Sequence, residues 1–247
     1  MAKQKVIRFK KGVVQDWVDA ILWAFVVAMI IRNYTFQNFR IPTSSMERTL
    51  LVGDYLYANK MKYFFQEPKR GEIVTFRNPD DKIKADPNNR FIKITEPDNK
   101  RLISILPPIY WDVDTKFFTW WEKKNIVKRV IGVPGDTLWI LNKQVYVNGE
   151  PYTIEQEQYL DKSIYPFEYM HCVWNNEVMG SRDNFKQVIV PEKNYFVLGD
   201  NRDNSLDSRF FGWLPLEDIT GTPGMIFFSR DAIWGEIRKD RFLKVIK

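Results

Sequence analysis

The N-terminal segment places the strongest limit on how this chain can be arranged. Residues 1–11 carry five basic residues and no acidic one, and residues 20–31 form an unbroken run of twelve apolar residues. Counted from Val13, the apolar stretch is nineteen residues long, with three polar residues near its start. Because roughly 17–25 mostly apolar residues suffice for a helix to cross a bilayer, the pattern predicts a transmembrane helix over residues 12–33.

Three interpretations of this segment differ in where the rest of the chain lies. Basic residues stay on the cytoplasmic side, so an uncleaved span would place everything after about residue 33 outside the cytoplasm. Asp16 and Asp19 share a helix face near the start of the run, where they can lie at headgroup depth. A cleaved secretory signal would need small residues at a cut site, whereas residues 32–36 are Arg-Asn-Tyr-Thr-Phe. A buried amphipathic helix is the remaining alternative.

Short runs of β-branched and aromatic residues dominate the chain after this segment. They predict strands over residues 55–57, 72–76, 126–131, 145–147, 188–190 and 195–198. Asn148-Gly149 is typical of a hairpin turn, and Pro134-Gly135 suits a type II turn. The sequence therefore predicts a mainly β protein, with an antiparallel β-sheet domain on a single N-terminal transmembrane helix.

Composition divides the chain into successive parts. We expect a basic cytoplasmic segment (1–11), the transmembrane helix (12–33), a β core (34–79, 126–144 and 188–230), an insertion (80–125), a second β-rich insertion (145–187) and a basic C-terminal tail (231–247). The first insertion begins polar and becomes rich in Tyr, Phe and Trp. Core packing is the favoured interpretation of these aromatic residues, and contact with a membrane interface is the alternative.

Histidine and cysteine each occur once, which excludes much catalytic chemistry. A lone Cys172 forms no intramolecular disulfide and no thiolate zinc cluster. A Ser-His-Asp triad would have to use His171, which has no serine beside it and is better explained as a packed or surface histidine. The acidic run that starts at Asp203 fails as a calcium loop, because Ser208 stands where glycine is needed and Leu214 where glutamate is needed. No metal or cofactor is expected.

A serine can also be activated by a lysine, provided that burial lowers the lysine pKa from about 10.4. Residues 126–131 (IVKRVI) offer Lys128 and Arg129 inside an apolar strand. Strand alternation does not choose between them, but only lysine can lose its proton. Ser44 and Ser45, in a segment with turn character, are the candidate nucleophiles.

These segments together resemble bacterial type I signal peptidase, the membrane-bound Ser/Lys leader peptidase. The similar blocks are residues 39–56 (FRIPTSSMERTLLVGDYL), 71–79, 126–136 (IVKRVIGVPGD) and 195–215 (YFVLGDNRDNSLDSRFFGWLP), in the family's order. They cover about a quarter of the chain, and the last block is the most specific.

The resemblance implies a role for each matching residue. Ser45 would be the nucleophile and Lys128 the general base. Thr43 and the Ser45 backbone N–H would form the oxyanion hole. Ser205 would orient the lysine, with Asp207 and Arg209 as a supporting ion pair. Shallow pockets for small side chains one and three residues before the cut would be lined by Phe39, Ile41, Pro42, Met46, Leu50, Leu56 and Val127.

The same resemblance implies the partners and the location. We expect a monomer in the bacterial cytoplasmic membrane, with its catalytic domain on the extracytoplasmic face, cutting precursors after Ala-x-Ala signals. Arg48 stands where the family often has proline, and Ser44 where it commonly has a smaller residue. Two other hypotheses remain open: a self-cleaving Ser/Lys regulator and an inactive membrane-anchored binding module.

The net charge of +6 is not a nucleic-acid signature. Residues 1–11 contribute +5 and residues 230–247 contribute +3, which leaves 26 basic and 28 acidic residues between them. We therefore expect no nucleic-acid partner, and the basic N-terminus instead indicates membrane topology.

Overall fold

The computed structural model describes residues 12–77, 100–105, 108–112, 117–119, 125–174, 176–231 and 235–246. The basic segment 1–11 lies outside these residues, as do the side chains of the expected insertion 80–125. The predicted core packing of the aromatic residues in that insertion therefore stays a prediction. Its described backbone forms a three-stranded antiparallel sheet of β4 (Lys100–Ile105), β5 (Pro108–Asp112) and β6 (Phe117–Thr119).

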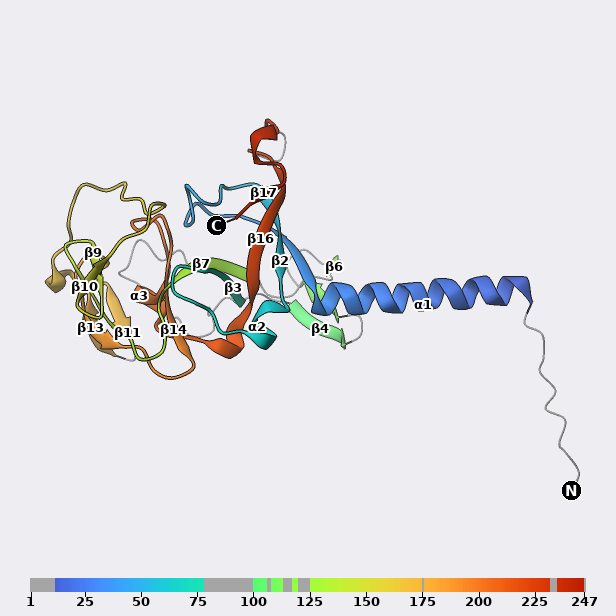
Figure 1. Cartoon of the computed structure of the whole chain (residues 1–247), viewed down its shortest axis with the longest axis horizontal. Helices are drawn as coiled ribbons and strands as arrows, with labels where there is room; N and C mark the ends of the chain where they lie inside the picture. Colours follow the sequence, from blue (N-terminus) through green and yellow to red (C-terminus); the bar gives the residue numbers. More distant parts are fainter. Residues whose placement is uncertain are drawn as a thin grey trace, which may run out of the picture.

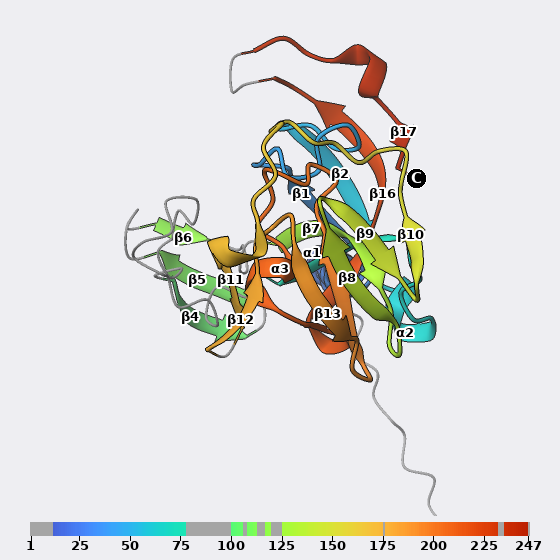
Figure 2. The same cartoon turned by 90° about the vertical axis from the view of Figure 1, so that its left-hand side faces the viewer.

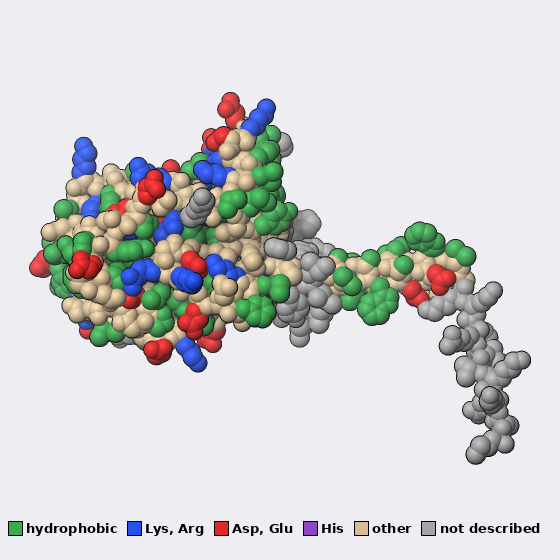
Figure 3. Space-filling model, viewed as in Figure 1, with side chains coloured by type: hydrophobic (Ala, Val, Ile, Leu, Met, Phe, Trp, Pro, Cys, Tyr) green, Lys and Arg blue, Asp and Glu red, His purple; other side chains and the backbone are tan. Residues whose placement is uncertain are grey.

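The expected N-terminal helix is present as α1 (Val13–Tyr34), which extends away from the β-rich body (Figure 1). Large apolar side chains on this helix are exposed, among them Trp17, Trp23 and Phe25 (Figure 3). Within the described residues, no helix combines the length and the apolar character needed to cross a bilayer. The helical conformation is thus confirmed, and the crossing itself stays a prediction.

The first sheet contains the strands that carry or flank the candidate site segments. Within the described residues it has eight strands: β1 (Phe36–Arg40), β2 (Asp54–Asn59), β16 (Ile219–Ser229), β3 (Ile73–Arg77), β7 (Asn125–Gly132), β14 (Asn194–Leu198), β15 (Leu214–Pro215) and β17 (Lys244–Val245), which pairs with β16. Its strand pairs are antiparallel. The strands expected near residues 55–57, 72–76, 126–131 and 195–198 are confirmed as β2, β3, β7 and β14.

The second sheet lies at the end of the body opposite α1 and faces the viewer in Figure 2. In the described chain it has six strands: β10 (Glu150–Tyr152), β9 (Gln144–Val147), β8 (Thr137–Leu141), β13 (Phe185–Ile189), β12 (Glu177–Gly180) and β11 (Cys172–Trp174). Asn148 and Gly149, at φ +54° and +91°, form the hairpin turn that the sequence predicted. The sheet begins at Thr137, ahead of the expected boundary at residue 145.

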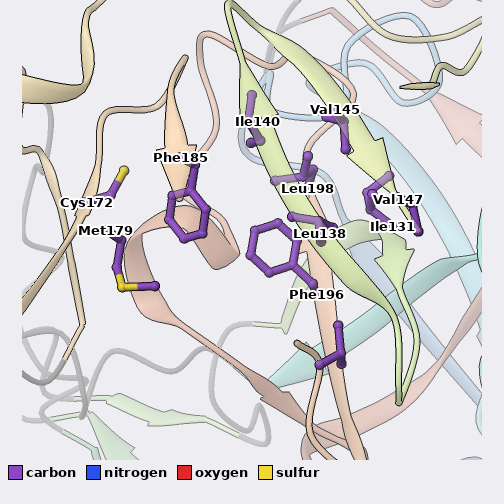
Figure 4. Packing of buried hydrophobic residues seen from close by; sticks show 11 residues of the cluster. Ile131, Leu138, Ile140, Val145, Val147, Cys172, Met179, Phe185, Phe196 and Leu198 are labelled. Carbon is purple, nitrogen blue, oxygen red and sulfur yellow. The ribbon is translucent and has the colours of Figure 1, made fainter. Parts of the chain in front are cut away.

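Three apolar clusters hold these sheets together. Figure 4 shows the first, in which side chains of β8 and β9 pack against Phe185, Phe196 and Leu198. The second gathers residues from the β1–β2 loop and from β7, and the third fills the space around Phe76 and Tyr195. The second cluster anchors the loop that carries the candidate nucleophile.

Helices outside α1 are short in the described residues. They are α2 (Lys62–Phe65), α3 (Ser208–Phe211) and the 3₁₀ turns η1 (Phe167–Tyr169), η2 (Leu216–Asp218) and η3 (Lys239–Arg241). Three parts of the fold position the candidate site: the β1–β2 loop, the strand β7, and the segment between β14 and α3.

Candidate active site

Ser45 lies in a closed loop, residues 41–53, between β1 and β2. The Gly53 N–H donates to the Ile41 carbonyl at 2.9 Å, and the Ile41 N–H donates to the Asp54 carbonyl at 2.8 Å. Gly53 has a φ of +91°, and a Cβ there would lie 1.8 Å from the backbone oxygen of Arg230. Only glycine fits this position, so Gly53 allows the loop to close.

Ser45 is buried, with 8% of its surface exposed, and its hydroxyl oxygen lies 3.4 Å from the Thr43 hydroxyl oxygen. The backbone on both sides of this hydroxyl is held from outside the loop. The Asn201 N–H donates to the Ser45 carbonyl at 3.1 Å, and Asn201 Nδ2 donates to the Ser44 carbonyl at 3.3 Å. The peptide group that carries the Ser45 N–H is thereby fixed in direction, since a trans peptide is planar.

Lys128 lies on β7, between β3 and β14 in the first sheet, and is 2% exposed. Burial lowers the pKa of its ammonium from 10.5 to about 8, and the guanidinium of Arg209 acts in the same direction. The carboxylates of Asp207 and Asp200 oppose this shift. Among the described residues, no hydrogen bond joins Lys128 Nζ to Ser45 or to Ser205.

Asp207 and Arg209 form a buried ion pair at the start of α3. Arg209 Nε and Nη2 each donate to one Asp207 oxygen at 2.8 Å, and the Asp207 side chain also caps α3 by accepting from the Arg209 N–H. Burial raises the pKa of Asp207, but the charge and hydrogen bonds of Arg209 outweigh it and hold the pKa below its ordinary value. The remaining Arg209 donors bind the carbonyls of Arg182 and Arg202, so the segment between β14 and α3 is fixed.

Gly199 marks the point where the predicted residues converge. A Cβ at this position would lie 2.3 Å from Ser205 Oγ and 2.5 Å from the Ser45 carbonyl oxygen. Its N–H donates to Asp207 Oδ2 at 3.1 Å. Because Gly199 directly follows β14, the strand next to β7, it joins the Ser45 loop to the strand of Lys128.

The apolar residues expected around the substrate fall into one cluster, with one exception. Ile41, Met46, Leu50, Leu56 and Val127 are buried together with Ile73 and Ile226, and Phe39 packs against them. Pro42 is exposed. Leu50 and Leu56 are 0% exposed, so they act as core residues beneath the loop.

A second buried ion pair, which the sequence did not indicate, lies beside Lys128. Arg129 Nε and Nη2 each donate to one Asp200 oxygen at 2.8 Å, and Thr49 Oγ1 donates to Asp200 Oδ2. This contact ties the Ser45 loop to the strand of the candidate base. The position of Asp200 two residues after the apolar strand β14 was the signal that could have identified it.

The structure also describes Arg48 and His171, two residues that the sequence analysis discussed. Arg48 has a φ of +78°, a conformation closed to the proline that often occurs at this place in the similar family, and its Nη1 donates to the Glu157 carbonyl at 3.1 Å. His171 packs its ring against Tyr165 and Tyr169, at centroid distances of 5.8 and 4.1 Å. The expectation of a packed or surface histidine is confirmed, since His171 is partly buried against these two rings.

Comparisons with known proteins agree on one family. A family model described as signal peptidase, peptidase S26, matches residues 14–228. A signal peptidase I of Bacillus amyloliquefaciens is 30% identical over 246 residues, covering 98% of this chain and 100% of that protein. A signal peptidase I of Aquifex aeolicus (strain VF5) is 32% identical over 230 residues, covering 84% of this chain and 82% of that protein.

A crystal structure of a signal peptidase I from Enterococcus faecalis V583 matches 64% of this chain and 97% of its own, at 22% identity and a TM-score of 0.35. That superposition is loose, so the assignment rests on the sequence matches. Because the family model spans most of the chain and one relative of 30% identity is matched over its whole length, this chain belongs to the signal peptidase family, peptidase S26.

Proposed function

We propose that this chain is a serine endopeptidase that removes N-terminal signal peptides from exported precursors, with Ser45 as nucleophile and Lys128 as general base. The observation that carries the proposal is the buried Lys128, whose pKa of about 8 leaves part of the amine neutral near neutral pH. The close approach of Ser45 to Gly199, directly after the strand beside Lys128, supports this pairing of the two residues.

Acylation follows from these positions. Neutral Lys128 takes the proton of the Ser45 hydroxyl as its oxygen attacks the scissile carbonyl carbon. The Ser45 N–H and the Thr43 hydroxyl donate to the oxyanion that forms, and one such donor typically contributes ~2.7–4 kcal/mol of transition-state stabilisation. Lys128 then passes its proton to the leaving amine, which becomes the N-terminus of the mature protein.

Deacylation uses the same base. The signal peptide is held as an ester on Ser45, and Lys128 takes a proton from the water that attacks this ester. Return of that proton to the Ser45 oxygen breaks the ester and releases the signal peptide. Ser205 orients the lysine in this scheme, and the pair of Asp207 and Arg209 keeps the surrounding segment rigid.

The apolar cluster under the loop supports the proposed substrate preference. Phe39 and Ile41 stand beside the loop, and Pro42 is exposed next to Thr43. We infer that the surface above these residues accepts small side chains one and three residues before the cut, the Ala-x-Ala pattern. The enzyme acts as a monomer in this proposal and needs no cofactor.

The decisive test of the function is cleavage by the purified full chain in detergent. A precursor with an Ala-x-Ala site should be cut once, and N-terminal sequencing of the larger product should begin directly after that site. A precursor with a bulky residue in place of the last alanine serves as the matched control and should remain intact. Cleavage of this chain alone would instead favour the self-cleaving regulator, and binding without turnover would favour the inactive module.

Membrane anchoring through α1 is part of the proposal. Ten large apolar side chains between Val13 and Val27 are exposed on the helix, and residues 1–11 are basic. Ser45 follows residue 31 by only 14 residues, so the site would lie near the outer membrane surface. That position matches the cut site of a precursor held by its own apolar segment.

The full chain expressed in bacteria should therefore stay with the membrane fraction after extraction at alkaline pH. The double variant Leu22→Asp, Val26→Asp should be released from the membrane fraction by this treatment. Each carboxylate in the middle of a membrane span carries a large free-energy penalty. Release of the unaltered chain by the same treatment would contradict the anchor.

A further inference from the structure

The C-terminal segment, residues 235–246, packs against the part of the sheet that carries the Ser45 loop. β17 pairs with β16 at Met225 and Ile226, and Ile246 packs on the apolar cluster that includes Met46. Figure 1 shows β17 beside β16 close to the end of the chain. The family model ends at residue 228, so this segment lies beyond it.

Arg241 makes the most specific contacts of this segment. It is 5% exposed, and its Nε and Nη2 donate to the two Asp54 oxygens at 3.0 and 2.6 Å. Nη2 also donates to the Thr49 carbonyl at 3.0 Å. Asp54, fully buried, in turn accepts from the Leu51 N–H at 2.8 Å and from the Ser229 hydroxyl at 2.6 Å. Arg241 thus binds the Ser45 loop at its closing end and at Thr49.

Thr49 connects this contact to the candidate catalytic groups. Its N–H donates to the Met46 carbonyl at 3.1 Å, within the turn that begins at Ser45. Its hydroxyl donates to Asp200 and lies 3.3 Å from Arg129 Nη2, which donates to it. The backbone of Thr49 is therefore held by Arg241 on one side, while its side chain is held by the ion pair next to Lys128 on the other.

We propose that Arg241 is a positioning residue for the nucleophile: it acts through Asp54 and Thr49 to hold the Ser45 loop against the strand of the general base. The inference rests on the proposed role of Ser45. Burying the Arg241 guanidinium carries a desolvation penalty, and a buried ion pair often stabilises a protein less than apolar side chains of similar volume would. Its fork geometry, which reaches a carboxylate and a carbonyl at once, suits a positioning role.

The test measures kcat and KM of the full chain in detergent with an Ala-x-Ala peptide, at a temperature well below unfolding. Arg241→Ala should lower kcat by about 10- to 100-fold with KM within about twofold, because a small displacement of a reacting group has effects of this size. Arg241→Lys keeps a charge for Asp54 but does not reproduce the fork, so its kcat should fall by an intermediate factor. Lys239→Ala, which removes the same charge from the same turn, is the matched control and should retain wild-type kcat.

Chemical rescue separates positioning from general stability. Millimolar methylguanidinium should restore part of the kcat of Arg241→Ala, with no effect on the wild type or on Lys239→Ala. The proposal would be overturned if Arg241→Lys and Arg241→Ala both kept the wild-type kcat. It would also be overturned if the loss of activity equalled the fraction of unfolded protein and methylguanidinium did not restore it. If Arg241→Ala does not fold, the kcat of Arg241→Lys decides alone.

The two levels of inference fail differently. Continued cleavage by Ser45→Ala would remove the proposed function and this inference with it. An inactive Ser45→Ala together with fully active Arg241 variants would defeat only the role of Arg241.

Discussion

Replacing Ser45 by alanine is expected to abolish precursor cleavage, with a fall in kcat of at least about 10⁴-fold, the scale found when a serine nucleophile is removed. The hydroxyl lies in a closed, buried turn beside Thr43, and alanine removes it without adding volume. Binding of the precursor should persist, because the apolar cluster under the loop is untouched. Cleavage is measured with a fluorogenic Ala-x-Ala peptide, and binding from the change in fluorescence anisotropy of a labelled form of the same peptide.

Ser44 provides a matched control for this change. It is the adjacent residue, and its hydroxyl accepts from Asn204 Nδ2 at 2.8 Å. Ser44→Ala therefore loses one hydrogen bond that is partly exposed, for which a cost of about 0.5–1.5 kcal/mol and at most about a tenfold change in rate are expected. If Ser44→Ala were inactive and Ser45→Ala active, Ser44 would have to be assigned as the nucleophile in place of Ser45.

Local patterns were sufficient to predict most strands near the site. β7 and β14 are short apolar runs bounded by turn residues, and both occur where expected. The Pro134-Gly135 turn also forms as predicted, with Gly135 at φ +86° and a hydrogen bond from the Asp136 N–H to the Val133 carbonyl. In these segments the side-chain pattern and the turn chemistry agree with each other.

The longest strand among the described residues, β16, was not predicted because its sequence contains Gly221, Pro223 and Gly224. Its register explains why these residues fit. Residues 219 and 221 pair with β3 and residues 222–229 with β2, so the strand changes partners near the proline, with register shifts at that point. A Cβ at Gly221 would lie 2.6 Å from the Asn59 oxygen, so the glycine allows the close approach of β2. This strand forms because it pairs with β2 and β3, which are distant in the sequence. A short stretch of sequence around it therefore does not predict it.

The candidate site shows the same division. Local patterns offered Lys128 together with Ser44 or Ser45, and the resemblance to the family singled out Ser45 as the nucleophile. The contacts that join these segments could not be predicted, since Arg129 and Asp200 are 71 residues apart and Arg241 and Asp54 are 187 apart. Strand alternation likewise left Lys128 and Arg129 equivalent, and only the three-dimensional packing gives Arg129 a carboxylate partner at 2.8 Å.

Replacing Lys128 is the second change with a large expected effect. Lys128→Met keeps the length of the side chain without an amine, and Lys128→Arg keeps a positive charge that is not lost near neutral pH. Both variants should lose about 10²–10⁴-fold in kcat, the usual contribution of a general base. Methionine is close to lysine in volume, so Lys128→Met should fold and tests the chemistry separately from packing.

The pH dependence of the wild type should report the same group. Because the neutral amine is the active form, kcat/KM should rise about tenfold per pH unit below a pKa of about 8 and level off above it. The residual activity of Lys128→Met should lack this rise. A wild-type profile that is flat between pH 6 and 10 would contradict a lysine base.

Stability gives an independent measure of the Lys128 pKa. Its folded value of about 8 lies below the ordinary 10.5, so between these values the unfolded chain binds more protons than the folded one. The free energy of unfolding should therefore increase as the pH rises from about 8 to 10.5. Below pH 8 Lys128 is charged in both states, and the destabilisation from burying its charge is complete. Denaturant unfolding of the wild type and of Lys128→Met measures this difference. If the two curves run parallel with pH, burial has not lowered the lysine pKa, and the amine would be charged when Ser45 needs a base.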